Sequence, residues 1–470
     1  MSRLDSLVEE LLYDILEYVH YSSNSSNNLF NLLTVASKYH RIAKDILYTA
    51  PRLLKPEPNA KAGWNDRRAH QLVGFLKRLL EEPHLAKWVR KLELCIIFDS
   101  SARHSACTET DCPDTSHWPT WDTYSALVDE LNFGPKSAVG LSSLRAAYSR
   151  HLATGFEPAT ASLILALVPS LQCLTINSYY HRFKKRARRN FPPTSIHFRD
   201  WYGQGAIEDP GTIIGLDNII SLKTTGMIYW SWMRKPKIRF LEICMPMSGR
   251  AGLHVELSPA NAEISPNITT LIVCATYPWW DESPSRYLRV LTQGLTFLTR
   301  LQLRIVDRLK SLEGRGGYEY AVKQIQAPGL QTLVLDARLI EYSIGSFDDG
   351  NIAPAEATPI ASLTKFPDLR RIVGPMEAFM PKPGRKPCDF PPSIESIEII
   401  NSLGERFPDF VQTLADNDDL PNLKSILLWE NGEDEQRCED SDVPKEVREW
   451  SRRRGIFIGS GRGELGLSQG

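Results

Sequence analysis

Four possible metal ligands lie close together in one polar stretch of the chain. They are His104, Cys107, Cys112 and His117. Neutral imidazole and thiolate are the ligands that Zn²⁺ prefers, so a structural zinc site is the chemistry to consider first. Structural zinc sites normally show a tighter pairing of cysteines and of histidines than this stretch has. We therefore interpret the stretch as a polar insertion, and we predict neither a metal site nor a cofactor.

A dense run of basic side chains offers a second kind of chemistry, the binding of anions. The run contains Lys184, Lys185, Arg186, Arg188 and Arg189. Nuclear import is the leading functional interpretation, followed by contact with an acidic or phosphorylated partner, because arginine pairs with phosphate through two hydrogen bonds. A solvated loop that carries no function is an equally good interpretation. Nucleic acid is an unlikely ligand here, since no second basic stripe accompanies the run.

Aromatic side chains gather just beyond several predicted strands. The candidates for a substrate-binding patch are Tyr229, Trp230, Trp232, Tyr277, Trp279 and Trp280. Loops that follow the strands of a repeat protein lie along one rim, and exposed Trp and Tyr side chains are favoured anchors at protein interfaces. The alternative, which we favour slightly for each residue taken singly, is that these rings cover the ends of an apolar core.

No motif typical of an enzyme is present in the sequence. The chain lacks a phosphate-binding loop with its Lys-Ser/Thr pair, a nucleophile elbow at a strand–helix junction and a zinc-protease helix. Its 55 basic and 56 acidic residues leave a formal net charge of −1, so no global field draws it to nucleic acid or to an anionic membrane. We therefore predict a non-catalytic protein that recognises other proteins.

The elements that must position these side chains follow a recurring pattern, apolar-x-x-apolar-x-apolar. Clear copies begin at residues 89, 171, 238, 268, 298, 330, 394 and 423, and weaker ones at 219 and 369. A proline-containing turn precedes many of them, as at Pro266, Pro328 and Pro421. Several neighbouring copies lie about 30 residues apart, and such recurrence marks a solenoid in which each strand is buried by its neighbours.

This recurrence predicts an α/β fold, an irregular leucine-rich-repeat-like solenoid with a parallel sheet. The units are longer than typical leucine-rich repeats, and only Asn177 lies near the asparagine position of such repeats. A doubly wound α/β fold is the competing architecture, but it would lack the shared turn and strand signature. We expect the solenoid to span 88–430, with insertions near 99–165 and 178–215. A C-terminal helix, a last strand and a disordered tail should follow over 431–470.

The first residues predict a short helical module. Ser6 and Glu9 form a possible capping box, and Leu7, Leu11 and Ile15 repeat at helical spacing. Two further short helical patterns follow and end before Pro51. Roughly fifty residues of short helices bury little core by themselves, so the module is either a cap on the next domain or a surface for another protein. We place it at 1–55, with linker helices over 56–87.

These residues resemble an F-box motif, in order and through its whole length. The chain reads Leu7-Val8-Glu9-Glu10-Leu11-Leu12-Tyr13-Asp14-Ile15-Leu16, then has a leucine-rich stretch from Leu32 to Ala43, and then Leu47-Tyr48. Val8 stands where F-box proteins usually have proline, and Tyr39-His40 stand where tryptophan is common. The arrangement of the whole chain is similar to fungal F-box proteins with leucine-rich-repeat-like bodies.

The resemblance implies a substrate-recognition subunit of an SCF-type ubiquitin ligase. The module would bind a Skp-type adaptor, and through it a cullin scaffold, while the repeats hold an unknown protein substrate. The residues that the resemblance assigns to adaptor binding are Leu7, Val8, Leu11, Leu12, Ile15, Leu16, Leu32 and Val35. A protein-interaction scaffold that acts without ubiquitination is the alternative. The N-terminus does not read as a signal peptide and several cysteines lie in apolar segments, so we expect a cytoplasmic or nuclear protein with reduced thiols.

Overall fold

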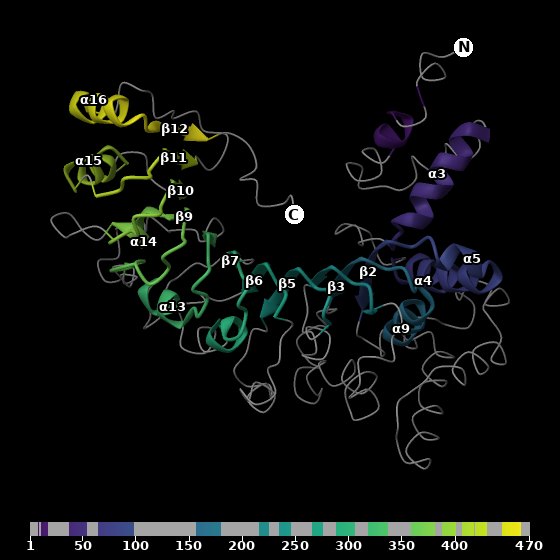
Figure 1. Cartoon of the computed structure of the whole chain (residues 1–470). Coiled ribbons are helices and arrows are strands. Elements are labelled where there is room, and N and C mark those ends of the chain that lie inside the picture. Colours follow the sequence, from purple (N-terminus) through teal and green to yellow (C-terminus); the bar gives the residue numbers. More distant parts are fainter. Residues whose placement is uncertain are drawn as a thin grey trace, which may run out of the picture. The chain divides into compact units, whose positions relative to one another are not determined.

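The fold is described from a computed structural model, which divides into two compact units, Met1–Lys237 and Ile238–Gly470. The residues that the structure describes are 8, 11–16, 37–53, 64–97, 157–179, 216–224, 235–245, 266–275, 288–305, 318–336, 359–380, 388–400, 407–417, 419–429 and 444–461. Each unit is an α/β array of parallel strands, and both are drawn in Figure 1.

The described part of the first unit pairs four strands in chain order, all of them parallel. A short helical segment over 11–16 precedes the named elements. These are α3 (Ser37–Thr49), β1 (Arg52–Leu53), α4 (Trp64–Glu81), α5 (Pro83–Ala86), β2 (Lys91–Ile97), α9 (Glu157–Leu167), β3 (Cys173–Tyr179) and β4 (Ser221–Thr224).

The second unit repeats the same arrangement with eight strands in its described part, again parallel and in chain order. The strands are β5 (Phe240–Met245), β6 (Thr270–Ala275), β7 (Arg300–Ile305), β8 (Thr332–Asp336), β9 (Arg371–Pro375), β10 (Ser396–Ile400), β11 (Ser425–Trp429) and β12 (Phe457–Gly461). The helices are α13 (Tyr318–Gln324), α14 (Met376–Phe379), α15 (Phe407–Asn417) and α16 (Lys445–Arg454).

The predicted repeat pattern is confirmed in every copy. Each pattern places its first apolar residue in the turn and the other two on the strand, and all of these side chains are buried. Leu271, Leu301 and Leu333 illustrate the result, because they are direct neighbours across β6, β7 and β8. An inward row of this kind removes apolar surface from water only when adjacent repeats are stacked, which explains the parallel order.

Backbone hydrogen bonds fix the step from one repeat to the next. The carbonyl oxygen of Thr269 accepts from the N–H groups of Thr299 and Arg300, and the carbonyl oxygen of Thr299 accepts from Gln331 and Thr332. The same doubled acceptor recurs at Gln331, Arg370 and Glu395 further along the unit. Buried backbone groups need partners, and this bonding satisfies the N–H groups that begin each strand.

Helices form a layer on one side of the strands in the second unit. Figure 1 shows α13, α15 and α16 on the same side of β8 to β12. Helix α16 ends at Gly455, whose φ of 67° lies in the left-handed region that glycine adopts without strain. Arg452, Arg453 and Arg454 occupy its last turn, where positive charge complements the helix dipole. Helix α16 and strand β12 lie within 431–470, where the sequence predicts a C-terminal helix and a last strand.

Among the described elements, five were not predicted individually from the sequence: strand β1 and helices α9, α13, α14 and α15. Helix α9 overlaps the end of the predicted insertion near 99–165, and it buries Leu163, Ile164 and Leu165. Strand β1 has two residues, Arg52 and Leu53, which pair with Glu93 and Leu94 of β2. The α/β class and the parallel sheet are as predicted.

Candidate functional site

The helical segment over 11–16 presents one apolar stripe to solvent. Val8, Leu11 and Ile15 are 58%, 50% and 41% exposed, respectively, although all three are large and apolar. The helical bond from the Leu12 N–H to the Val8 carbonyl oxygen, 3.2 Å long, places Val8 on the same helix. At about 100° per residue the three side chains fall within about 60° of one another. Exposed apolar residues that are aligned in this way form a continuous surface.

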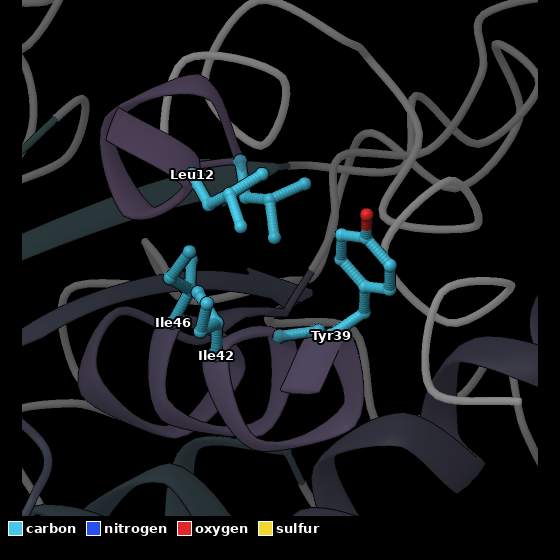
Figure 2. Packing of buried hydrophobic residues seen from close by; sticks show 6 residues of the cluster. Leu12, Tyr39, Ile42 and Ile46 are labelled. Carbon is cyan, nitrogen blue, oxygen red and sulfur yellow. The ribbon is translucent and has the colours of Figure 1, made fainter. Parts of the chain in front are cut away.

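The adjacent stripe of the same helix is buried inside the chain. Leu12 and Leu16 pack in a cluster with Tyr39, Ile42, Ala43 and Ile46 of α3, with Tyr13 and Leu47 partly buried at its edge. Figure 2 shows Leu12 directed at Ile42 and Ile46, with Tyr39 beside them. The apolar face of this helix is therefore divided, one half held by α3 and the other half open.

Helix α3 is in turn fixed to the body of the first unit. The carbonyl oxygens of Thr49 and Pro51 accept hydrogen bonds from the N–H groups of Arg90 and Glu93, at 2.9 and 3.1 Å. Lys44 Nζ lies 3.9 Å from Glu82 Oε2, next to α5. The exposed stripe of Val8, Leu11 and Ile15 therefore lies on a helix that packs against α3, and α3 is attached to the rest of the first unit.

The described residues among those predicted to bind the adaptor fall into two groups, exposed and buried. Val8, Leu11 and Ile15 are exposed, and Leu12 and Leu16 are internal. Leu7, Leu32 and Val35 lie outside the described residues. In this structure Leu12 and Leu16 hold the helix to α3, while the outward side chains remain available to another protein.

The other predicted interaction residues also lie outside the described part of the chain. These are the basic run Lys184, Lys185, Arg186, Arg188 and Arg189, the aromatic candidates Tyr229, Trp230, Trp232, Tyr277, Trp279 and Trp280, and the possible zinc ligands at 104, 107, 112 and 117. The basic run and the aromatic candidates remain predictions from the sequence, and no metal site is predicted for the His and Cys side chains.

A set of charged and polar side chains that was not predicted lies on one face of β5 and β7 to β10, half-buried or buried, beside the apolar cluster of Val334, Val373 and Ile400. The side chains that alternate with the buried apolar rows are polar on several consecutive strands. We call these residues the charged strand face: Glu242, Arg300, Gln302, Arg304, Asp336, Arg371 and Glu398. The signal was present in the alternation of Arg300, Gln302 and Arg304 with Leu301 and Leu303.

The C-terminal part of this face is held by a paired carboxylate. Glu398 is 4% exposed and accepts from Arg371 through both carboxylate oxygens, at 2.5 Å from Nε and 2.9 Å from Nη2. The indole N–H of Trp429 donates to the same carboxylate at 2.9 Å. A buried carboxylate needs such donors because removal from water penalises its charge.

Arg304 forms the centre of a second group of charges. Its guanidinium lies 3.4 Å from Glu242 Oε1 and 3.4 Å from Asp336 Oδ2. The contact to Asp336 is an ion pair without hydrogen-bond geometry, since Arg304 Nε has no hydrogen-bond acceptor. Gln302 Nε2 donates to the same Oδ2 atom of Asp336, at 3.3 Å. Arg371 and Arg304 are thereby each paired with carboxylates, which offsets the cost of holding their charges in a low-dielectric environment.

The described residues contain neither a metal-binding cluster nor a membrane-spanning helix. No group of three or more His, Cys, Asp or Glu side chains in the described ranges is arranged to hold a metal ion. None of the helices in that part of the chain is long and apolar enough to cross a membrane.

Comparison with known proteins yields distant structural similarity and no match in sequence. No protein-family model matches the chain, and no curated protein is significantly similar in sequence. The solved structure of the leucine-rich repeat-containing protein LegL7 from Legionella pneumophila aligns with 81% of this chain and 86% of its own, at 12% sequence identity and a TM-score of 0.29. A superposition of that quality carries no inference about function.

Proposed function

We propose that this chain is the substrate-recognition subunit of an SCF-type ubiquitin ligase. Its N-terminal helices would bind a Skp-type adaptor, the adaptor would bind a cullin scaffold, and the repeats would hold a protein substrate. The chain itself would catalyse no covalent step. It would raise the rate of ubiquitin transfer by holding substrate near a separate enzyme.

The observation that carries the proposal is the open apolar stripe of Val8, Leu11 and Ile15. An apolar stripe of this kind on an intact helix is typical of a surface that another protein covers. The order of the residues from Leu7 to Tyr48 resembles the F-box motif, which supplies the chemical class of that partner. A plain capping module would instead be expected to bury the stripe within its own chain.

The experiment is co-purification with a Skp-type adaptor after co-expression. Wild-type chain should retain the adaptor in stoichiometric amounts. Leu11→Asp and Ile15→Asp should each lose it, because the new carboxylate would have to be buried without a partner. Both side chains are at least 41% exposed in the free chain, so the variants should fold as the wild type does.

Phe297→Asp is the matched control, because Phe297 is a large apolar residue that is 58% exposed in the second unit. This variant should keep the adaptor. If wild-type chain recovers no adaptor, or if all three variants behave alike, the chain is better described as an interaction scaffold that acts without ubiquitination.

A further inference from the structure

Arg300 differs from the other two arginines of the charged strand face in having no counter-ion among the described residues. Its Nε and Nη2 atoms are shielded from solvent and have no hydrogen-bond partner in the described structure. Arg371 is paired with Glu398, and Arg304 is matched with Glu242 and Asp336. The three carboxylates of this face are thus already engaged by the other two guanidinium groups, and Arg300 is left over.

The surroundings of Arg300 make its charge costly. Burial lowers the pKa of Arg300, and the positive charges of Arg371 and Arg304 lower it further. Shielded N–H groups without acceptors are rare in proteins, and each such group destabilises the fold until an acceptor arrives. An anion near Arg300 would relieve both penalties together, because it supplies acceptor atoms and opposite charge.

Hydroxyl groups flank this arginine on both sides. Thr270 of β6 and Thr332 of β8 are the direct register partners of Arg300 on β7. Register partners on adjacent parallel strands lie about 4.8 Å apart, and they share one face of the sheet. Neither threonine side chain is hydrogen-bonded to another residue that the structure describes. One guanidinium between two free hydroxyl donors is a suitable arrangement for binding an oxyanion.

We propose that Arg300, with Thr270 and Thr332, binds a carboxylate or phosphate group carried by the protein substrate. The proposal rests on the proposed function in that it names the chemistry of the substrate which the repeats hold. Arg300 is partly exposed as a whole residue, as are Thr270 and Thr332, so a ligand would reach the group where these three side chains meet solvent.

The test uses the full-length chain and two small probes, inorganic phosphate and glutarate, at constant ionic strength. Each probe at tenfold its Kd should raise the Tm of the second unit by about 2–5 °C. Arg300→Gln should abolish the rise, and its Tm without probe should equal or exceed that of the wild type, since an unpaired charge has been removed. Arg289→Gln, an exposed arginine elsewhere in the same unit, should leave the rise intact.

The relative response to the two probes distinguishes the sources of the anion. A stronger response to phosphate assigns a phosphorylated side chain, and a stronger response to glutarate assigns an Asp or Glu side chain. The proposal is overturned if neither probe changes the Tm, if Arg300→Gln responds like wild type, or if that variant is several degrees less stable without probe. Adaptor co-purification is measured on the same variants, and Arg300→Gln should retain the adaptor, so failure of the anion site is separable from failure of the proposed function.

Discussion

Two residues of the charged strand face, Glu398 and Arg300, differ in whether their polar atoms are paired within the chain. Glu398 is buried and receives donors from both Arg371 and Trp429, so its hydrogen-bonding capacity is used inside the chain. Arg300, on the same face, has none of its shielded N–H groups engaged. The distinction is one of pairing, and it gives opposite expectations for substitution at the two positions.

Replacing Glu398 should destabilise the second unit. Glu398→Gln leaves the Arg371 guanidinium without its carboxylate, at a cost of about 2 kcal/mol in unfolding free energy, less than for a fully buried pair because Arg371 is partly exposed. Urea unfolding followed by hydrogen exchange in β9 to β11 measures the loss. The double variant Arg371→Met with Glu398→Leu should recover most of it, and a double variant as unstable as the single one would contradict the pairing.

Cys388 should be unreactive in the native protein. Burial raises the pKa of its thiol, and the nearby Asp389 and Glu319 carboxylates raise it further, so the reactive thiolate is scarce at pH 8. Alkylation by iodoacetamide, read by mass spectrometry, should therefore require urea. A cysteine placed on the surface of the same unit by Asp368→Cys should react at once. Equal rates at both positions in native protein would show that Cys388 is not enclosed.

Packing between elements fixes strand β9 against its neighbours at Gly374. A Cβ atom there would lie 2.8 Å from Phe379 Cζ and 3.3 Å from Leu335 Cβ. The Phe379 ring is fully buried and packs with Phe390, with ring centroids 5.9 Å apart, so it has little room to move. Strand β9 and helix α14 can approach this closely only because residue 374 has no side chain.

Gly374→Ala should accordingly destabilise the second unit by about 1–3 kcal/mol through overpacking. Chemical denaturation measures the change. Gly329→Ala is the control, because its Cβ would have only an ordinary contact of 3.8 Å with the Thr296 carbonyl oxygen. Restoring space with Gly374→Ala and Phe379→Leu together should recover part of the loss. An unchanged stability for Gly374→Ala would mean that β9 and α14 adjust freely.

The elements differ in how well the sequence predicts them. The frame of Ile268, Leu271 and Val273 predicts β6 because burial on one face of a strand imposes a period of two, and the turn before it repeats as well. Helix α9 was missed because Leu163, Ile164 and Leu165 are consecutive, which shows no helical period. Strand β1 has only two residues, too few for any alternation to be read.

Pairing on the charged strand face could not be predicted from one sequence. The polar positions were readable, since Arg300 and Arg304 alternate with leucines. Which carboxylate each arginine meets depends on the register between strands far apart in sequence, such as Arg371 opposite Ser396 and two residues from Glu398. The divided face of the first helix was hidden for a similar reason, because its buried half is defined by α3 and not by its own spacing.

At the scale of the whole molecule, the proposed roles are assigned to different units. The first unit carries the open stripe of Val8, Leu11 and Ile15, and the second carries the charged strand face. A recognition subunit of this kind needs one surface for a constant partner and another for a substrate. Substitutions at one surface should therefore leave binding at the other unchanged, which is the expected result for sites that share no residues.

The most direct test is a calorimetric titration of a purified Skp-type adaptor into the full-length chain, wild type and Leu11→Asp. Burying one leucine contributes about 1.5–3 kcal/mol, and burying an unpaired carboxylate adds a further penalty, so Leu11→Asp should weaken binding at least about 100-fold. The Tm of the free variant should stay within about 2 °C of wild type, because the changed side chain is half exposed. Saturable binding by wild type that the variant loses is the predicted result. Absence of heat for wild type, or equal affinity for both chains, would contradict the assignment of this stripe to an adaptor.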